Sequence, residues 1–363
     1  MNSQPAHPLA RAALGGLYLP EPEQREEVCR SRKVIDLGSN TNPWGSDLKC
    51  YPPSRPVFLQ ERYASFLRDE LRVAGATALA PSAENILFTN GSVDGISLLV
   101  AAFCEPFKDC ICVCDPTFPF YARAAACNDV AVRHELLQGR DLNSFDPRAI
   151  STHSPKLTFL CSPSNPVGTT LDSACITELL DNTSGLVVID EAYSEFSALP
   201  SAMRWLTRAP HLVVLRTFSK AWGLAGARAG AVIADPLILH TLRLVQLIYS
   251  FGTPGQRHVQ EALAEPARMQ QNVQRIRAQR DRFAQELARL PIVKRVYPSD
   301  TNFLLVAFND AAGAYEALLN AGILVADTCR QVPGTLRITT GTVEHCAQVV
   351  GVLREMCGRS ARA

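Results

Sequence analysis

The sequence predicts an α/β protein with a large domain built on a mostly parallel sheet and a smaller α+β domain after it. Short apolar runs rich in β-branched residues alternate with helical patterns between residues 85 and 233, the order expected of a parallel sheet wrapped by helices. These runs carry few polar residues, which is typical of strands covered on both faces. After residue 252 a long charged helical pattern begins, which indicates a second domain.

The elements of the large domain follow one another in this alternation. Strands are expected at Asn85–Thr89, Cys110–Cys114, Ala131–Glu135, Leu157–Cys161, Leu186–Asp190, His211–Arg216 and Gly230–Ile233. Helices are expected at Gly91–Cys104, Thr117–Cys127 and Leu171–Leu180.

The smaller domain is expected to open with a helix from about Gln256 to Leu290, broken near Pro266. Its other expected elements are strands at Val293–Tyr297, Phe303–Ala307, near Ile323 and at Leu336–Thr339, and helices at Ala311–Ala321 and from about Val343. The predicted limits are residues 1–45 for an irregular N-terminal arm packing on the small domain, 46–252 for the large domain and 253–363 for the small domain.

Composition narrows the class of protein. A chain of 363 residues is long for a single core, and 36 Lys+Arg against 35 Asp+Glu give a net charge of +1. That balance does not favour nucleic acid or an anionic membrane as a partner. No apolar run approaches the roughly 20 residues that span a bilayer, and the N-terminus does not resemble a signal peptide, so we expect a cytoplasmic protein.

Twelve cysteines occur without any C-x-x-C pair. Cys110, Cys112 and Cys114 would share one face of a strand, where ligands converge poorly on a metal. We interpret them as small buried side chains in a reducing compartment, and we expect no metal site.

Chemistry is expected where strands end, because open α/β sheets bind ligands at the carboxyl ends of their strands. Asp190 directly follows an apolar strand, where it either pairs with a protonated pyridine nitrogen or caps a helix. Lys220, in Thr217-Phe218-Ser219-Lys220, follows the next strand, and a sheltered lysine becomes a nucleophile toward aldehydes.

Anion-binding features accompany these two residues. Arg228 lies in a run rich in Gly and Ala, and it either grips a phosphate or forms a structural ion pair. Asn90-Gly91-Ser92 stands at a strand-to-helix junction, where free amides bind anions and Ser92 can also cap the helix. Asn165, in the loop Ser162–Gly168, can hydrogen-bond a ligand oxygen. Together, in this order, the features are far more specific than any one of them.

At these residues the chain resembles the fold-type I pyridoxal-phosphate aminotransferases, most closely the histidinol-phosphate aminotransferases. The matching segments are Asn40-Thr41-Asn42-Pro43, Ala102–Pro106, Ser162–Gly168, Asp190–Tyr193, Leu215–Arg228, Asp300–Phe303 and Leu336–Thr342. The resemblance covers nearly the whole chain from about Ile35, and it implies a seven-stranded-type sheet, pyridoxal 5′-phosphate as cofactor, and a homodimer with shared sites.

The resemblance also implies roles for individual residues. Lys220 is similar to the Schiff-base lysine, Asp190 to the partner of the pyridine nitrogen, and Tyr193 with Asn165 to the pair that hydrogen-bonds the ring hydroxyl. Phe118 stands where the family has a ring-stacking tyrosine. The cofactor phosphate would be held by Gly91, Ser92, Thr217, Ser219, Arg228 and, from the neighbouring subunit, Tyr51. Substrate would be bound by Arg337 at its α-carboxylate, with Asn165 and Asn42 assisting. Tyr18 would either contact the substrate as well or serve as a packing residue.

Departures from the family concern the substrate. Thr41 replaces the Glu of the family's Asn-Glu-Asn-Pro, Val93 replaces an acidic residue, and Ala326 stands where the family carries an arginine for the substrate phosphate. Such an arginine contributes roughly 1.5–3 kcal/mol. We therefore expect transamination between a non-phosphorylated L-amino acid and a 2-oxo acid.

Three alternatives remain open at this stage. They are histidinol-phosphate aminotransferase activity itself, decarboxylation or elimination on the same scaffold, and a regulatory binding module. The last would need a DNA-binding segment, for which about 45 irregular N-terminal residues are too few.

Overall fold

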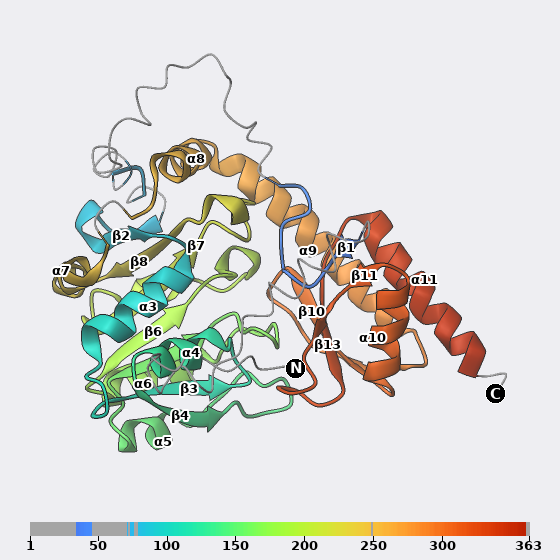
Figure 1. Ribbon diagram of the computed structural model, residues 1–363, viewed down its shortest axis with the longest axis horizontal. Coiled ribbons are helices and arrows are strands. Elements are labelled where there is room, and N and C mark those ends of the chain that lie inside the picture. Colours follow the sequence, from blue (N-terminus) through green and yellow to red (C-terminus); the bar gives the residue numbers. More distant parts are fainter. Residues whose placement is uncertain (1–33, 46–70, 72, 76–78, 248–249, 361–363) are drawn as a thin grey trace, which may run out of the picture.

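The computed structural model describes residues 34–45, 71, 73–75, 79–247 and 250–360. Its larger part contains a seven-stranded sheet in the order β2-β8-β7-β6-β5-β3-β4 (Figure 1). The strands are β2 (Ile86–Thr89), β3 (Cys110–Asp115), β4 (Ala131–Leu136), β5 (Leu157–Cys161), β6 (Leu186–Asp190), β7 (Leu212–Thr217) and β8 (Gly230–Ala234). Strand β8 runs in the opposite direction to the other six strands of this sheet. The predicted α/β class with a mostly parallel sheet is confirmed.

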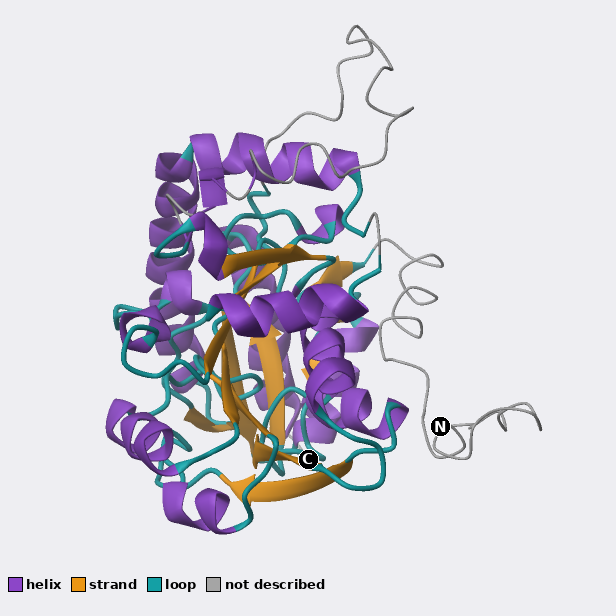
Figure 2. Cartoon of the chain, turned by 90° about the vertical axis from the view of Figure 1, so that its left-hand side faces the viewer, coloured by secondary structure: helices purple, strands orange, loops and turns teal. Residues whose placement is uncertain are grey.

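Helices cover both faces of this sheet (Figure 2). They are α3 (Ser92–Phe103), α4 (Phe120–Cys127), α5 (Pro147–Thr152), α6 (Ser173–Asn182) and α7 (Pro236–Val245). Helices α3, α4 and α7 share one core cluster, whereas α5 and α6 pack in the cluster on the other face. The inner strands are therefore buried on both sides, as their apolar sequences require.

The smaller part follows a pair of helices, α8 (Thr253–Ala264) and α9 (Pro266–Ala288), which are separated at Glu265 as predicted. Its four-stranded antiparallel sheet has the order β12 (Ala326–Asp327), β13 (Thr335–Thr339), β10 (Phe303–Phe308), β9 (Val293–Val296). Helices α10 (Ala311–Asn320) and α11 (Val343–Ser360) cover it.

The segment before the large sheet returns to the small domain. Strand β1 (Ile35–Asp36) pairs in parallel with β11 (Ile323–Leu324), and Leu37 is buried in the small domain's core. This pairing brings residues 38–42 toward the edge of the large sheet, where they contact the site described below.

Among the helices whose bounds lie within the described ranges, α5 and α7 were not expected from the sequence, and both have clear start signals. Asp146 caps α5 and Asp235 caps α7, each followed by proline in the first turn. The remaining short elements are 3₁₀ turns at Ala83–Asn85, Ser194–Phe196, Ala202–Trp205 and Ala225–Ala227.

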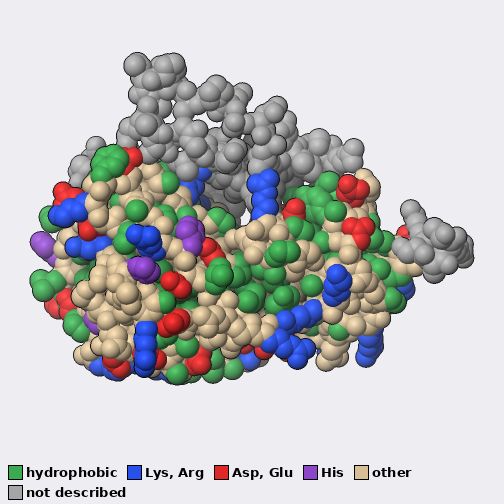
Figure 3. All heavy atoms as spheres, turned by 90° about the horizontal axis from the view of Figure 1, so that it is seen from below, with side chains coloured by type: hydrophobic (Ala, Val, Ile, Leu, Met, Phe, Trp, Pro, Cys, Tyr) green, Lys and Arg blue, Asp and Glu red, His purple; other side chains and the backbone are tan. Residues whose placement is uncertain are grey.

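The surface charge, the helices and the cysteines of the described residues indicate neither a membrane span nor a metal site. Basic and acidic side chains are interspersed on the face drawn in Figure 3. The described helices include none with the length and apolarity needed to cross a bilayer. Among the same residues, no group of His, Cys, Asp or Glu side chains is arranged to hold a metal ion, and the ten described cysteines are free thiols.

Candidate active site

The predicted site residues come together at the carboxyl ends of β6 and β7. Asp190 ends β6 and pairs in register with Leu215 of β7, five positions before Lys220. At the neighbouring strands, Thr217 and Thr89 both pair with Gly230, so the ends of β2 and β7 meet at the start of β8. The strand pairing therefore places side chains from distant segments at one edge of the sheet.

Asp190 is a buried carboxylate with two hydrogen-bond donors. Its Oδ2 accepts from the Tyr121 hydroxyl at 2.8 Å, and its Oδ1 accepts from the Ala192 N–H at 3.1 Å. Burial raises the pKa of Asp190 to about 6, and the Tyr121 hydrogen bond is the main influence that opposes this rise. The side chain can thus be ionised near neutral pH, and it would be stabilised by a cation.

Lys220 lies in the loop after β7, and its Nζ donates to the Ser39 carbonyl at 3.0 Å. Burial lowers the pKa of Lys220 to about 7, with further lowering from Arg337 and Arg228. A substantial fraction of this amine is therefore neutral and nucleophilic near pH 7.

The pKa of Lys220 predicts how the apoprotein reacts with a small aldehyde. Neutral amine increases as pH rises through about 7, so modification of Lys220 should rise over that range and then level off. Borohydride trapping followed by peptide mass spectrometry at a series of pH values measures this. Exposed lysines in the same digests are internal standards, with midpoints near about 10.4. A midpoint for Lys220 near that standard value would contradict the argument.

An anion cradle adjoins Lys220. Helix α3 begins at Ser92, and Gly91 before it has φ +83°, a conformation that favours glycine. A Cβ on Gly91 would lie 2.7 Å from an Arg228 guanidinium nitrogen, and one on Gly230 would lie 2.5 Å from the Ser92 amide nitrogen. Only glycines allow this approach of the helix N-terminus and Arg228, and such an arrangement fits a phosphate group.

Two hydroxyls complete the cradle. Thr217 Oγ1 lies 3.1 Å from Ser219 Oγ, which in turn accepts from Arg228 at 3.5 Å. The sequence-predicted phosphate residues Gly91, Ser92, Thr217, Ser219 and Arg228 are thus assembled in one place.

Arg337 approaches from β13 of the small domain. Its guanidinium donates to Asn165 Oδ1 at 2.5 Å and to the Gly38 carbonyl at 2.7 Å. Ala326 pairs directly with Arg337 across β12 and β13, so the residue opposite Arg337 carries only a methyl group. Arg337 therefore has no arginine opposite it on β12, and a single guanidinium can bind one carboxylate.

The remaining predicted residues differ in their surroundings. Tyr193 is buried and accepts a hydrogen bond from Asn40 Nδ2 at 3.0 Å. Asn42 donates from its amide to the Ala221 carbonyl and accepts from the Trp44 N–H, so its side chain braces the loop of Lys220. Phe118 packs edge-on against Tyr121 with centroids 5.6 Å apart. Tyr18 and Tyr51 lie outside the described residues.

Sequence reasoning did not single out Tyr121 or Asn40 as site residues. Asn40 donates to Tyr193, and it also exchanges hydrogen bonds with Thr339. The backbone of Asn40 is left-handed, with φ +51°. The Asn40-Thr41-Asn42-Pro43 motif was a usable signal for it. Tyr121 lies inside a helical pattern, and nothing in that pattern indicates that its hydroxyl reaches a strand end.

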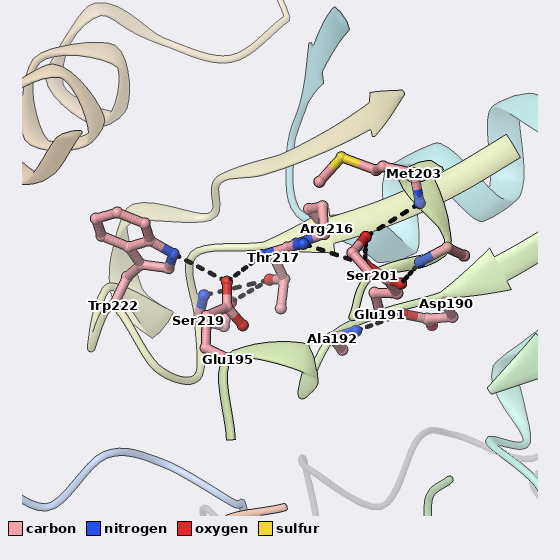
Figure 4. Close-up of polar contacts among 11 residues, drawn as sticks. Asp190, Glu191, Ala192, Glu195, Ser201, Met203, Arg216, Thr217, Ser219 and Trp222 are labelled. Atoms are coloured by element: carbon pink, nitrogen blue, oxygen red, sulfur yellow. Dashed lines mark hydrogen bonds and ion pairs between the residues drawn. The ribbon is translucent and has the colours of Figure 1, made fainter. Parts of the chain in front are cut away.

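A buried ion network lies behind the site (Figure 4). Arg216 contacts Glu191 at 3.1 Å and Glu195 at 2.7 Å, and the Trp222 indole N–H donates to Glu195 at 3.2 Å. Burial lowers the pKa of Arg216, but Glu195 and Glu191 outweigh burial, so that pKa is raised overall. The network ties the turn after Asp190 to both sides of the loop that carries Lys220.

A buried lysine with a lowered pKa, a cradle that fits an anion and a buried carboxylate lie at one edge of a mostly parallel sheet, and this combination fits a pyridoxal-phosphate-dependent enzyme. The chain belongs to the aminotransferase class I and II family, whose model matches residues 33–353, and it is a pyridoxal-phosphate-dependent aminotransferase.

Individual relatives agree with this assignment. A histidinol-phosphate aminotransferase of Xylella fastidiosa is 40% identical over 331 residues, covering 88% of this chain and 89% of the relative. One of Parabacteroides distasonis is 36% identical over 340 residues, covering 93% and 95%. The crystal structure of histidinol-phosphate aminotransferase from Sinorhizobium meliloti in complex with pyridoxal-5′-phosphate superposes with a TM-score of 0.82 at 22% identity, covering 98% and 99%. At that identity the last similarity concerns the fold.

Proposed function

We propose that this aminotransferase moves an amino group between a non-phosphorylated L-amino acid and a 2-oxo acid, with Lys220, Asp190 and Tyr193 as its catalytic residues. The proposal for the substrate rests on one observation above the others: Arg337 is paired across the sheet with Ala326. A single guanidinium suits the one negative charge of an α-carboxylate.

Pyridoxal phosphate, when bound, supplies an aldehyde for the amine and a ring that accepts the electrons left when the Cα proton departs. The cradle of Gly91, Ser92, Thr217, Ser219 and Arg228 holds its phosphate. Ionised Asp190 keeps the ring nitrogen protonated, and this is supported by its burial beside a single phenol donor.

Other residues fix the ring. Tyr193 and Asn165 hydrogen-bond its hydroxyl, and Phe118 stacks on its face. Tyr193 is suited to this because Asn40 already donates to its oxygen, which leaves the phenol proton free to donate onward.

Lys220 has two roles in succession. It first holds the cofactor covalently. In its second role, with the amine free, its Nζ would take the proton from the substrate Cα and hold it for return. The lowered pKa of Lys220 supports this role, because a base that titrates near 7 is available at neutral pH.

Arg337 orients the substrate. Its guanidinium would bind the α-carboxylate, assisted by Asn165, so that the Cα–H bond is presented for proton transfer. The Asn165 and Gly38 oxygens already fix the guanidinium plane. Asn42 and Tyr18 are proposed as further substrate contacts on the strength of the resemblance alone.

Histidinol phosphate is a second candidate substrate, favoured by the names of relatives at 36–40% identity. The two candidates differ at the position of Ala326, because a substrate phosphate would meet a buried methyl group there instead of a charge.

Steady-state kinetics with a panel of L-amino acids and histidinol phosphate tests the substrate proposal. We expect kcat/KM for the preferred amino acid to exceed that for histidinol phosphate at least about tenfold, since one missing charge-assisted hydrogen bond is worth roughly 1.5 kcal/mol or more. Arg337→Gln should lower kcat/KM about 10- to 100-fold, while the exposed control Arg354→Gln should not. A strong preference for histidinol phosphate would contradict the proposal.

A homodimer with shared sites is also proposed. Helix α7 and the residues just after it expose Leu237, Leu244 and Leu247 at 77%, 73% and 78%, and positions 237 and 244 are seven residues apart, on one side of the helix. We propose that a second copy covers this side. The resemblance implies that Tyr51 of this second copy would contact the cofactor phosphate.

Light scattering measures the assembly. We expect a mass twice the 39.6 kDa of the chain, and dissociation in Leu244→Arg but not in Leu136→Arg, which changes an exposed leucine of β4. A monomeric wild-type protein would refute the dimer.

The domain limits at residues 46 and 253 remain a prediction. A cytoplasmic location is supported by the free thiols.

A further inference from the structure

The Tyr121 phenol is a buried polar group that the mechanism above does not use. Tyr121 has no exposed surface, and its hydroxyl donates to Asp190 Oδ2 at 2.8 Å from a position 69 residues away in the chain. Burying a hydroxyl is unfavourable unless it is hydrogen-bonded, and phenylalanine would fill the same space without that requirement. Packing alone therefore does not explain a tyrosine here.

The ring of Tyr121 is fixed on two sides. It stacks on Phe159 of β5 with centroids 4.9 Å apart and an interplanar angle of 10°, and Phe118 meets it edge-on at 87°. The hydroxyl therefore has little freedom to turn away from Asp190. The other carboxylate oxygen accepts from the Ala192 N–H, so each oxygen has one donor that defines the plane of the carboxylate.

We propose that Tyr121 is a positioning residue for the reaction: its hydroxyl orients the Asp190 carboxylate toward the cofactor's ring nitrogen and favours its ionised form. The inference rests on the role proposed for Asp190 above. Tyr121 would also connect two proposed cofactor contacts. Its ring packs against Phe118, the proposed stacking residue, and its hydroxyl holds Asp190.

The electrostatic surroundings of Asp190 agree with this role. The titratable groups that change the pKa of Asp190 are Tyr121 of α4, Glu191 in the turn after β6 and Lys220 in the loop after β7. Cys161 of β5 and Tyr193 also face Asp190, which raises the pKa of each of them. Burial raises the pKa of Asp190, and the Tyr121 hydrogen bond offsets part of that rise, whereas Glu191 adds to it. Loss of the hydroxyl would therefore leave Asp190 protonated to a higher pH.

Cofactor affinity measured across pH tests the proposal independently of turnover. Apoprotein is titrated with pyridoxal phosphate, followed by protein fluorescence, for wild type, Tyr121→Phe, Asp190→Asn and the double variant. Tyr315→Phe, a half-buried tyrosine of the small domain, is the matched control. Ionisation of the cofactor itself is common to all of them and cancels in the comparison.

The expected results are specific. Wild-type affinity should fall as pH drops through about 6, where Asp190 becomes protonated. Tyr121→Phe should move this fall upward by about one pH unit, the order of effect of one hydrogen bond on a carboxylate, and so weaken binding about twofold at pH 7 and about tenfold at pH 5. Tyr315→Phe should match wild type. In Asp190→Asn the part of the fall near pH 6 should disappear, leaving only the dependence on Lys220, whose pKa is about 7, and adding Tyr121→Phe should then have no further effect.

Fluorotyrosine at position 121 is a stronger donor that keeps the ring, and it should move the fall in affinity to lower pH. If Tyr121→Phe folds and leaves the pH dependence unchanged while Asp190→Asn removes it, Tyr121 is a packing residue and the inference is wrong. If Asp190→Asn itself has no effect on affinity, the proposed role of Asp190 is also wrong.

Discussion

Replacing Lys220 with alanine is expected to lower the rate of amino-group transfer roughly 10⁴-fold or more. General acid–base catalysis alone contributes about 10²- to 10⁴-fold, and the variant also loses the covalent attachment of the cofactor. Rapid-mixing absorption spectroscopy of the half-reaction with a single amino acid measures the effect directly. Added small amines should restore part of the rate, because they can supply the missing base.

The control for this variant is Lys108→Ala, which removes a lysine whose side chain is 74% exposed and lies away from the site. It should retain the wild-type rate. A Lys220→Ala enzyme with a rate within tenfold of wild type would show that another group moves the Cα proton.

Replacing Arg216 with methionine is expected to lower the free energy of unfolding by about 3–5 kcal/mol. The side chains of Arg216, Glu191 and Glu195 are at most 9% exposed, and removing the arginine leaves two buried carboxylates without their cation. Urea unfolding of the apoprotein measures the loss. Adding Glu191→Gln and Glu195→Gln to the variant should recover part of it, since neutral amides are less costly to bury.

A matched surface pair gives the comparison. Arg148 contacts Glu178 at 3.0 Å, but the arginine side chain is 85% exposed, so Arg148→Met should cost at most about 1 kcal/mol. Equal losses for Arg148→Met and Arg216→Met would contradict the importance assigned to burial.

The parts of the fold that could be predicted are those with a strong local pattern. The strand Leu186–Asp190 is apolar up to its final aspartate, and its predicted bounds match β6. Because parallel strands end at one edge, the meeting of Asp190 with the loop of Lys220 followed from the strand assignments alone. Helix α7 was missed although Asp235 and Pro236 form a standard start, because its apolar sequence continues directly from a strand.

The contacts that could not be predicted depend on how distant segments pack. Tyr121 reaches Asp190 because α4 is rotated to bury that side chain, and Asn40 reaches Tyr193, 153 positions away, because β1 pairs with β11. Neither the rotation of a helix about its axis nor the pairing of distant strands can be predicted from local periodicity. The Arg216 network was missed for the same reason, since its two carboxylates follow one strand and its arginine ends the next.

The central claim is that Lys220 holds the cofactor at the edge of the large sheet. Borohydride treatment makes the carbon–nitrogen bond between lysine and cofactor permanent, and peptide mass spectrometry then locates it. We expect the phosphopyridoxyl group on the peptide that contains Lys220, in an amount that approaches one per chain. Modification of a different lysine, or purified protein that stays colourless and unlabelled with added pyridoxal phosphate, would contradict the account.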